Sequence, residues 1–177
     1  MSEKKPRSGA DTESEGGAGY SSPACQLHEA DPAYAGYLSD SELVDFLNTL
    51  LEGERAGDAV AAEFLAASPS PEARALLEAV KRDEARFAAM LARLVERLGG
   101  TPSERVGSFR DKALAIEGFA PRLEFLNRGQ GWVVRKLAET LPRIRDDRIH
   151  SALKGMLGAH EANIARCAAL LEALSAA

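Results

Sequence analysis

The sequence predicts an all-α protein, a four-helix bundle preceded by an N-terminal tail. From Ser39 onward, apolar residues recur every three or four positions, which is typical of helices with one buried face. No segment alternates apolar and polar residues convincingly with a period of two, so we expect no β-sheet. Breaks rich in proline and glycine divide the periodic region into four segments of similar length. Four such amphipathic helices pack most simply as a bundle.

The N-terminal segment has a different composition. Residues 1–26 contain no Leu, Ile, Val, Phe or Trp and cannot bury enough apolar surface to offset the entropy of ordering, so residues 1–21 are predicted to be a disordered tail. Residues 22–38 contain aromatic residues without a helical period, which predicts an extended leader that covers one end of the bundle. Cys25 and His28 in this leader are interpreted as incidental, and the alternative is that they supply metal ligands. The bundle itself occupies residues 39–176.

The first two helices have clear boundaries. Ser39 is a good N-cap for a first helix of about 26 residues. The segment 68–71 ends that helix, and Ser70 followed by Pro71 begins the second. The second helix stops at Gly99 and Gly100. The short turn between these helices predicts an antiparallel pair.

A connection of about 20 residues then leads to the third helix. It includes a short helix predicted near residues 112–116. The third helix begins near Phe119 and ends or kinks at Pro142, and Asp146 or Asp147 caps the fourth. At roughly 3.3 Å per residue, the connection can span a helix of about 39 Å, so the second and third helices can run parallel. A single long crossover gives the ferritin-like topology, and an up-down-up-down bundle with an idle loop is the alternative.

Each predicted helix interrupts its apolar stripe with a polar residue. Glu54 and Glu84 lie four positions after Leu50 and Val80, and both are 13 residues from the turn between their helices. His160 and Glu161 follow Met156 and Leu157 by four positions, and Gln130 lies between Leu126 and Val133. These groups therefore fall at similar heights in the bundle. Because a buried carboxylate needs a partner, the candidates are a metal, His160 or the arginines at 55, 86, 128 and 135.

Four segments around these polar positions carry a resemblance to a known group. The segments Leu47–Gly57, Asp83–Phe87, Leu126–Trp132 and His160–Ile164 resemble an uncharacterised bacterial ferritin-like group within the rubrerythrin-type superfamily. The superfamily's di-iron site takes one Glu from each of two helices and a Glu-x-x-His motif from each of the others. The resemblance implies that Glu54, Glu84 and Glu161 are the matching carboxylates. Phe87 and Ile164 replace both histidines, and Gln130 occupies the position nearest the remaining Glu.

These departures lead to two functional hypotheses. The one we favour is an interaction or ligand-binding module without metal, in which arginines neutralise a degenerate carboxylate site. The alternative is a metal-dependent oxidoreductase whose iron or manganese is held by Glu54, Glu84, His160 and Glu161, since oxygen and imidazole ligands suit these metals. Whether the protein is an enzyme stays open.

Charge and composition restrict location and partners. The 22 basic and 27 acidic residues give a net charge of −5, which argues against binding to nucleic acid or anionic membranes. No apolar run suits a signal peptide or a membrane span, and there are only two cysteines, so we expect a cytoplasmic location. Trp132 beside two helical glycines, Gly129 and Gly131, offers a flat surface for close approach, which predicts a homodimer.

Overall fold

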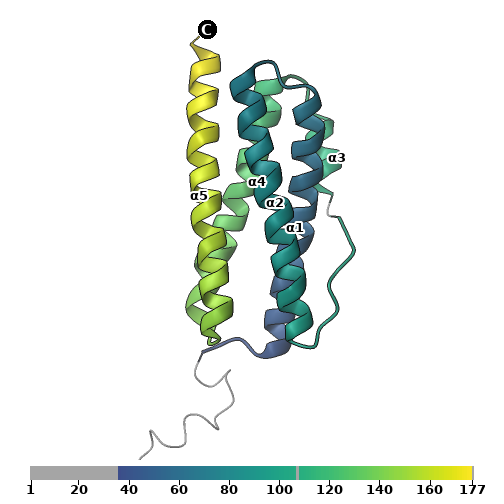
Figure 1. The fold of residues 1–177 in the computed structure, drawn as a ribbon, viewed down its shortest axis with the longest axis vertical. Helices are drawn as coiled ribbons and strands as arrows, with labels where there is room; N and C mark the ends of the chain where they lie inside the picture. The colour runs from purple at the N-terminus through teal and green to yellow at the C-terminus, as the bar shows by residue number, and fades with distance from the viewer. Residues whose placement is uncertain (1–35, 107, 177) are drawn as a thin grey trace, which may run out of the picture. The chain divides into compact units, whose positions relative to one another are not determined.

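The computed structural model describes residues 36–106 and 108–176. In this part of the chain there are five α-helices and one 3-10 helix, and no strand, so the all-α prediction is confirmed (Figure 1). The elements are α1 (Asp40–Ala66), α2 (Pro71–Arg97), α3 (Phe109–Leu114), α4 (Phe119–Thr140), η3 (Leu141–Arg143) and α5 (Asp147–Ser175). The predicted tail and most of the predicted leader lie outside the described residues.

The long helices begin at the caps that the sequence predicts. Ser39 and Glu42 form a capping box, in which each side chain accepts a hydrogen bond from the backbone N–H of the other. Ser70 caps α2 ahead of Pro71, and Asp146 accepts two backbone N–H groups at the start of α5. Local chemistry therefore determines where three of the four long helices start.

The short helix α3 differs from its predicted position at residues 112–116. It begins at Phe109, three residues earlier, and ends at Leu114. The Phe109 ring stacks on Phe125 of α4 with a centroid distance of 4.8 Å and lies directly over Gly129. This contact with a distant segment holds the first residue of α3 in place.

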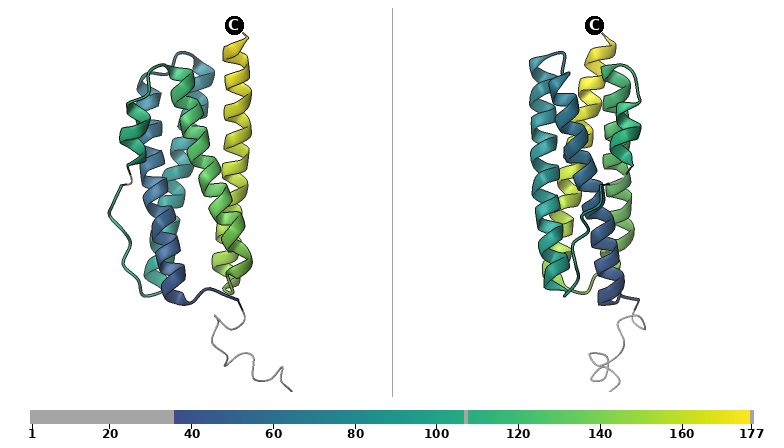
Figure 2. Two further views of the ribbon diagram at one scale, coloured as in Figure 1. Left: turned by 180° about the vertical axis from the view of Figure 1, so that it is seen from behind. Right: turned by 90° about the vertical axis from the view of Figure 1, so that its right-hand side faces the viewer.

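The connections set the directions of the four long helices. α1 packs against α2 and α4, and α5 packs against the same two helices. Figures 1 and 2 show that α2 and α4 run in the same direction, while residues 98–106 run beside α1 toward α3. Asn48 of α1 accepts a hydrogen bond from the backbone of Ser103 at 2.8 Å and so ties this connection to the helix. The long connection is used for a crossover, and the up-down-up-down alternative does not occur.

The interior is divided into two apolar clusters by a layer of polar side chains. One cluster includes Leu47, Leu91 and Leu153, and the other includes Phe64, Leu77 and Leu126. On each long helix, the buried polar residues of the described chain lie between the residues of one apolar cluster and those of the other. They are Glu54, Glu84, Gln130, His160 and Asn163.

The buried face of α5 differs from the predicted one. The residues that are fully buried follow one stripe, which is Ile149, Leu153, Met156, His160, Asn163 and Cys167. From helical spacing in the sequence we also expect four further residues of this helix to lie inside, but they are only half-buried, namely Leu157, Ile164, Leu171 and Leu174. Successive residues of a helix are rotated by about 100°, so one contact face cannot bury both this stripe and its neighbour.

The N-terminal end of the described chain contacts the helices. The Leu38 backbone N–H donates to the Arg143 carbonyl oxygen at 2.9 Å, and the Leu38 side chain packs on the first apolar cluster.

Among the described helices, none combines the length and apolar character needed to cross a membrane.

Candidate functional site

Three ionisable side chains meet in the polar layer. Glu54 on α1 and His160 on α5 are both 0% exposed, and Glu84 on α2 is also buried. Glu54 Oε1 lies 3.3 Å from His160 Nε2, although α1 and α5 do not pack directly against each other. The two side chains therefore reach across the centre of the helices, where the sequence predicted a shared layer.

Two neighbouring residues give these groups their positions. A Cβ atom at Gly57 would overlap the carboxyl group of Glu84, so the glycine allows that carboxyl to lie against the backbone of α1. Phe87, one turn after Glu84, packs its ring 5.6 Å from the His160 ring. An aromatic wall thus occupies the position where the ferritin-like pattern has a histidine.

Burial disfavours the charged forms of the ionisable side chains in the polar layer. It raises the pKa of Glu54 to about 8, and the nearby Glu84 only partly opposes this shift. Burial also raises the pKa of Glu84 well above its usual value, and the adjacent charge of Glu54 adds to the effect. Burial lowers the pKa of His160. All three shifts favour the uncharged forms of these side chains.

The predicted neutralisation by arginine is wrong. Arg55 donates to the Ser103 carbonyl oxygen, and Arg86 pairs with Asp83 at 3.0 Å. The other two candidates, Arg128 and Arg135, are exposed on α4. In the described part of the chain, none of these four arginines forms an ion pair with Glu54 or Glu84.

The layer contains one residue that sequence reasoning missed. Asn163 is buried one turn after His160 and donates to Asp83 Oδ2 at 3.1 Å. Its position four residues before Cys167, on the same apolar stripe, was the available signal. Asn163 extends the polar layer toward the outer side of α2.

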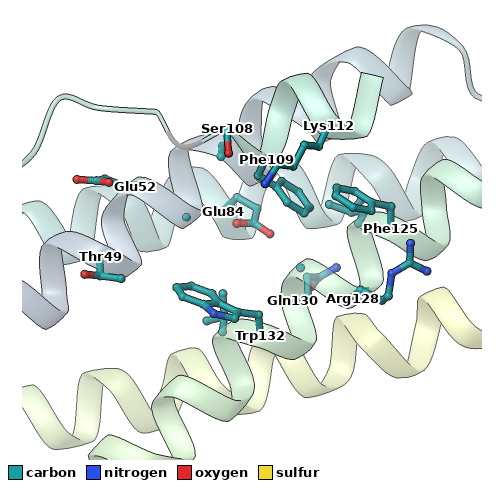
Figure 3. Close-up of a pocket in the computed structure, with 16 residues that line it drawn as sticks. Thr49, Glu52, Glu84, Ser108, Phe109, Lys112, Phe125, Arg128, Gln130 and Trp132 are labelled. Carbon is teal, nitrogen blue, oxygen red and sulfur yellow. The ribbon is translucent and has the colours of Figure 1, made fainter. Parts of the chain in front are cut away.

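A cavity opens beside this layer. It has a volume of about 650 Å³ and lies between α1, α3 and α4, with Glu84 of α2 at its inner end (Figure 3). The rings of Phe109, Phe125 and Trp132 line it, together with the carboxamide of Gln130. Gln130 is 2% exposed, and neither of its amide atoms has a hydrogen-bond partner. The cavity therefore presents an unsatisfied polar group within largely aromatic walls.

The helical region of the chain matches one known protein family. The model of a domain of unknown function (DUF6306) matches residues 41–169. The chain belongs to the DUF6306 family. The matched region contains the polar layer and the cavity, and it begins after the predicted leader. No curated protein and no solved structure matches the chain significantly.

The polar layer of this DUF6306 domain does not fit a di-iron centre. Of the four predicted ligands, the structure brings together Glu54, Glu84 and His160. Glu161 is exposed, because it lies about 100° around α5 from His160, and its predicted place in the layer is wrong. Within the described residues, no group of three or more His, Cys, Asp or Glu side chains is arranged to hold a metal ion.

Proposed function

We propose that this DUF6306 domain is a ferritin-like four-helix bundle that binds a small organic molecule in the cavity beside a degenerate carboxylate layer. The parallel directions of α2 and α4 support the ferritin-like topology, as does a buried polar residue at mid-length on each long helix. The proposal also keeps the cytoplasmic location and the homodimer expected from the sequence.

The observation that carries the proposal is the buried, unpartnered amide of Gln130 in the cavity wall. Leaving a buried polar group without a partner is unfavourable, so a ligand that bonds to it gains affinity. The cavity volume of about 650 Å³ falls within the range of typical small-molecule sites. An apolar lining with a few convergent polar groups is also typical of such sites.

A cavity-filling variant tests this function. Ala56 is buried and lines the cavity, whereas Ala62 is exposed on the same helix. With 2-naphthol as a neutral flat probe, isothermal titration calorimetry should show binding to the full chain. Ala56→Leu should weaken binding at least about tenfold, because the added side chain occupies ligand volume, and Ala62→Leu should leave it unchanged. Absence of binding, or equal binding by both variants, would contradict the proposal.

The metal-dependent oxidoreductase is the second candidate. It is favoured by the carboxyl oxygens of Glu54 and the ring nitrogens of His160, which form no hydrogen bonds. Glu54 Oε1 and His160 Nε2 lie 3.3 Å apart. Metal analysis of aerobically purified protein separates the two candidates. Stoichiometric iron or manganese that is lost in Glu84→Gln would replace the ligand-binding proposal, and metal-free protein that binds the probe would support it.

A further inference from the structure

Building on the proposed ligand-binding function, we infer that the cavity takes a flat aromatic acid whose anionic group lies at Lys112 and Arg128 and whose hydroxyl group reaches Gln130. Three features of the cavity lead to this ligand class. They are the shape of its walls, the charge at one side of its mouth and the unsatisfied group at its inner end.

The walls favour a planar aromatic body. Phe109 and Phe125 stack with an interplanar angle of 16°, and Trp132 lies across the cavity from them (Figure 3). Two glycines make room for these rings. A Cβ atom at Gly129 would come within 2.5 Å of the Phe109 ring, and one at Gly53 would touch Trp132 at 3.5 Å. Aromatic rings bind flat molecules by stacking or edge-to-face contact.

The charge at the mouth favours an anion. Lys112 of α3 and Arg128 of α4 flank the Phe109 and Phe125 rings (Figure 3). Within the described residues, Lys112 forms no ion pair. Arg128 approaches one carboxylate, Glu124 at 3.9 Å, and its guanidinium lies 5.4 Å from the centroid of the Phe125 ring. The lining carboxylate Glu52 is already engaged, since it pairs with Arg105 at 2.8 Å. The charges that remain available to a ligand at this side of the mouth are positive.

The inner end favours a hydroxyl group. The Gln130 amide offers an acceptor oxygen and two N–H donors, all without partners. Glu84 also lines this end of the cavity (Figure 3). A phenolic hydroxyl can both donate and accept, which matches the donor and acceptor atoms of the Gln130 amide.

A set of related probes separates the contributions to affinity. The probes are 6-hydroxy-2-naphthoate, 2-naphthoate, which lacks the hydroxyl, 2-naphthol, which lacks the carboxylate, and decanoate, which lacks the ring. Affinities for the full chain are measured by calorimetry. Trp132 is the sole tryptophan of the chain and lies in the cavity wall, so its fluorescence reports whether the probe is bound there. We expect 6-hydroxy-2-naphthoate to bind tightest, by roughly threefold to tenfold over each naphthalene probe that lacks one group.

Charge-removing variants locate the anion. Lys112→Gln and Arg128→Gln should each weaken binding of both naphthoates about threefold and leave 2-naphthol unchanged, because exposed charge pairs are partly screened. Lys154→Gln, on the exposed side of α5, is the matched control and should change nothing. Gln130→Leu should remove the advantage of the hydroxylated probe while leaving the protein folded, since it replaces an unsatisfied buried group by an apolar one of similar size.

The outcomes distinguish this inference from the proposed function. If 2-naphthol binds as tightly as the naphthoates, or if the lysine and arginine variants act no differently from Lys154→Gln, the aromatic-acid assignment is refuted and the binding function stands. Stronger binding of decanoate than of the naphthoates would refute the assignment in the same way. If no probe quenches Trp132 or releases heat, both proposals fail.

Discussion

Replacing Glu54 by Gln should stabilise the protein at high pH and have little effect at low pH. Gln has the shape of a protonated Glu but cannot ionise. Burial raises the pKa of Glu54 from 4.5 to about 8, so between these values the folded protein holds a proton that the unfolded chain has released. The stabilising effect of that proton is complete below pH 4.5 and is lost as the pH rises toward 8.

The size of the effect follows from this pKa shift. One pKa unit corresponds to about 1.4 kcal/mol, so the free energy of unfolding of the natural protein should fall by about 3 kcal/mol between pH 5 and pH 8 relative to Glu54→Gln. His160 acts in the opposite direction. Its pKa is lowered by burial, so it adds stability as the pH rises through the ordinary histidine range. Both proteins carry His160, and comparison of the two largely removes its contribution.

The measurement is urea unfolding followed by far-ultraviolet circular dichroism at several pH values and constant ionic strength. Glu161→Gln is the matched control, because this exposed carboxylate lies next to His160 in sequence but outside the layer. The control should follow the pH dependence of the natural protein. A difference between Glu54→Gln and the natural protein that stays constant from pH 5 to pH 8 would refute the conclusion that Glu54 is held protonated.

Further predictions concern packing, capping and assembly. Gly57→Ala should destabilise the protein by about 1–3 kcal/mol in urea unfolding, because the new methyl overlaps the Glu84 carboxyl, whereas Gly158→Ala, with open space around it, should stabilise it by about 1 kcal/mol. Equal effects of the two changes would show that Glu84 moves away freely. Ser39→Ala should cost about 1 kcal/mol in the same assay through loss of the capping box, and an unchanged midpoint would argue against that cap. Light scattering should give about twice the chain mass of 18.9 kDa for the predicted homodimer, and a mass near 18.9 kDa would contradict it.

Trp132 does not provide the flat dimer surface that the sequence predicted. Trp132 was expected on a flat outer surface, but it lines the cavity and packs on the first apolar cluster. Of its two neighbouring glycines, Gly129 makes room for Phe109 of α3. The homodimer therefore stays a prediction without an assigned contact surface.

Local sequence determined most of the secondary structure and the existence of a polar layer. Ser39, Ser70 and Asp146 mark helix starts because capping depends on hydrogen bonds within a few residues. The positions of Glu54 and Glu84 on their apolar stripes, at equal distance from one turn, were sufficient to predict that they meet. Capping residues and the spacing of apolar positions can be recognised from the sequence alone.

Tertiary structure decided which residues form the polar layer, how far burial shifts their pKa values, and where the cavity lies. The orientation of α5 depends on its contacts with α2 and α4, and it buries His160 and Asn163 while leaving Glu161 in solvent. The raised pKa values of Glu54 and Glu84 depend on how completely separate helices bury these carboxyl groups. The cavity is formed between α1, α3 and α4, where Phe109 of α3 lies over Gly129 and the buried Gln130 amide lacks a partner. These properties arise from distances between segments far apart in the chain, which no local pattern specifies.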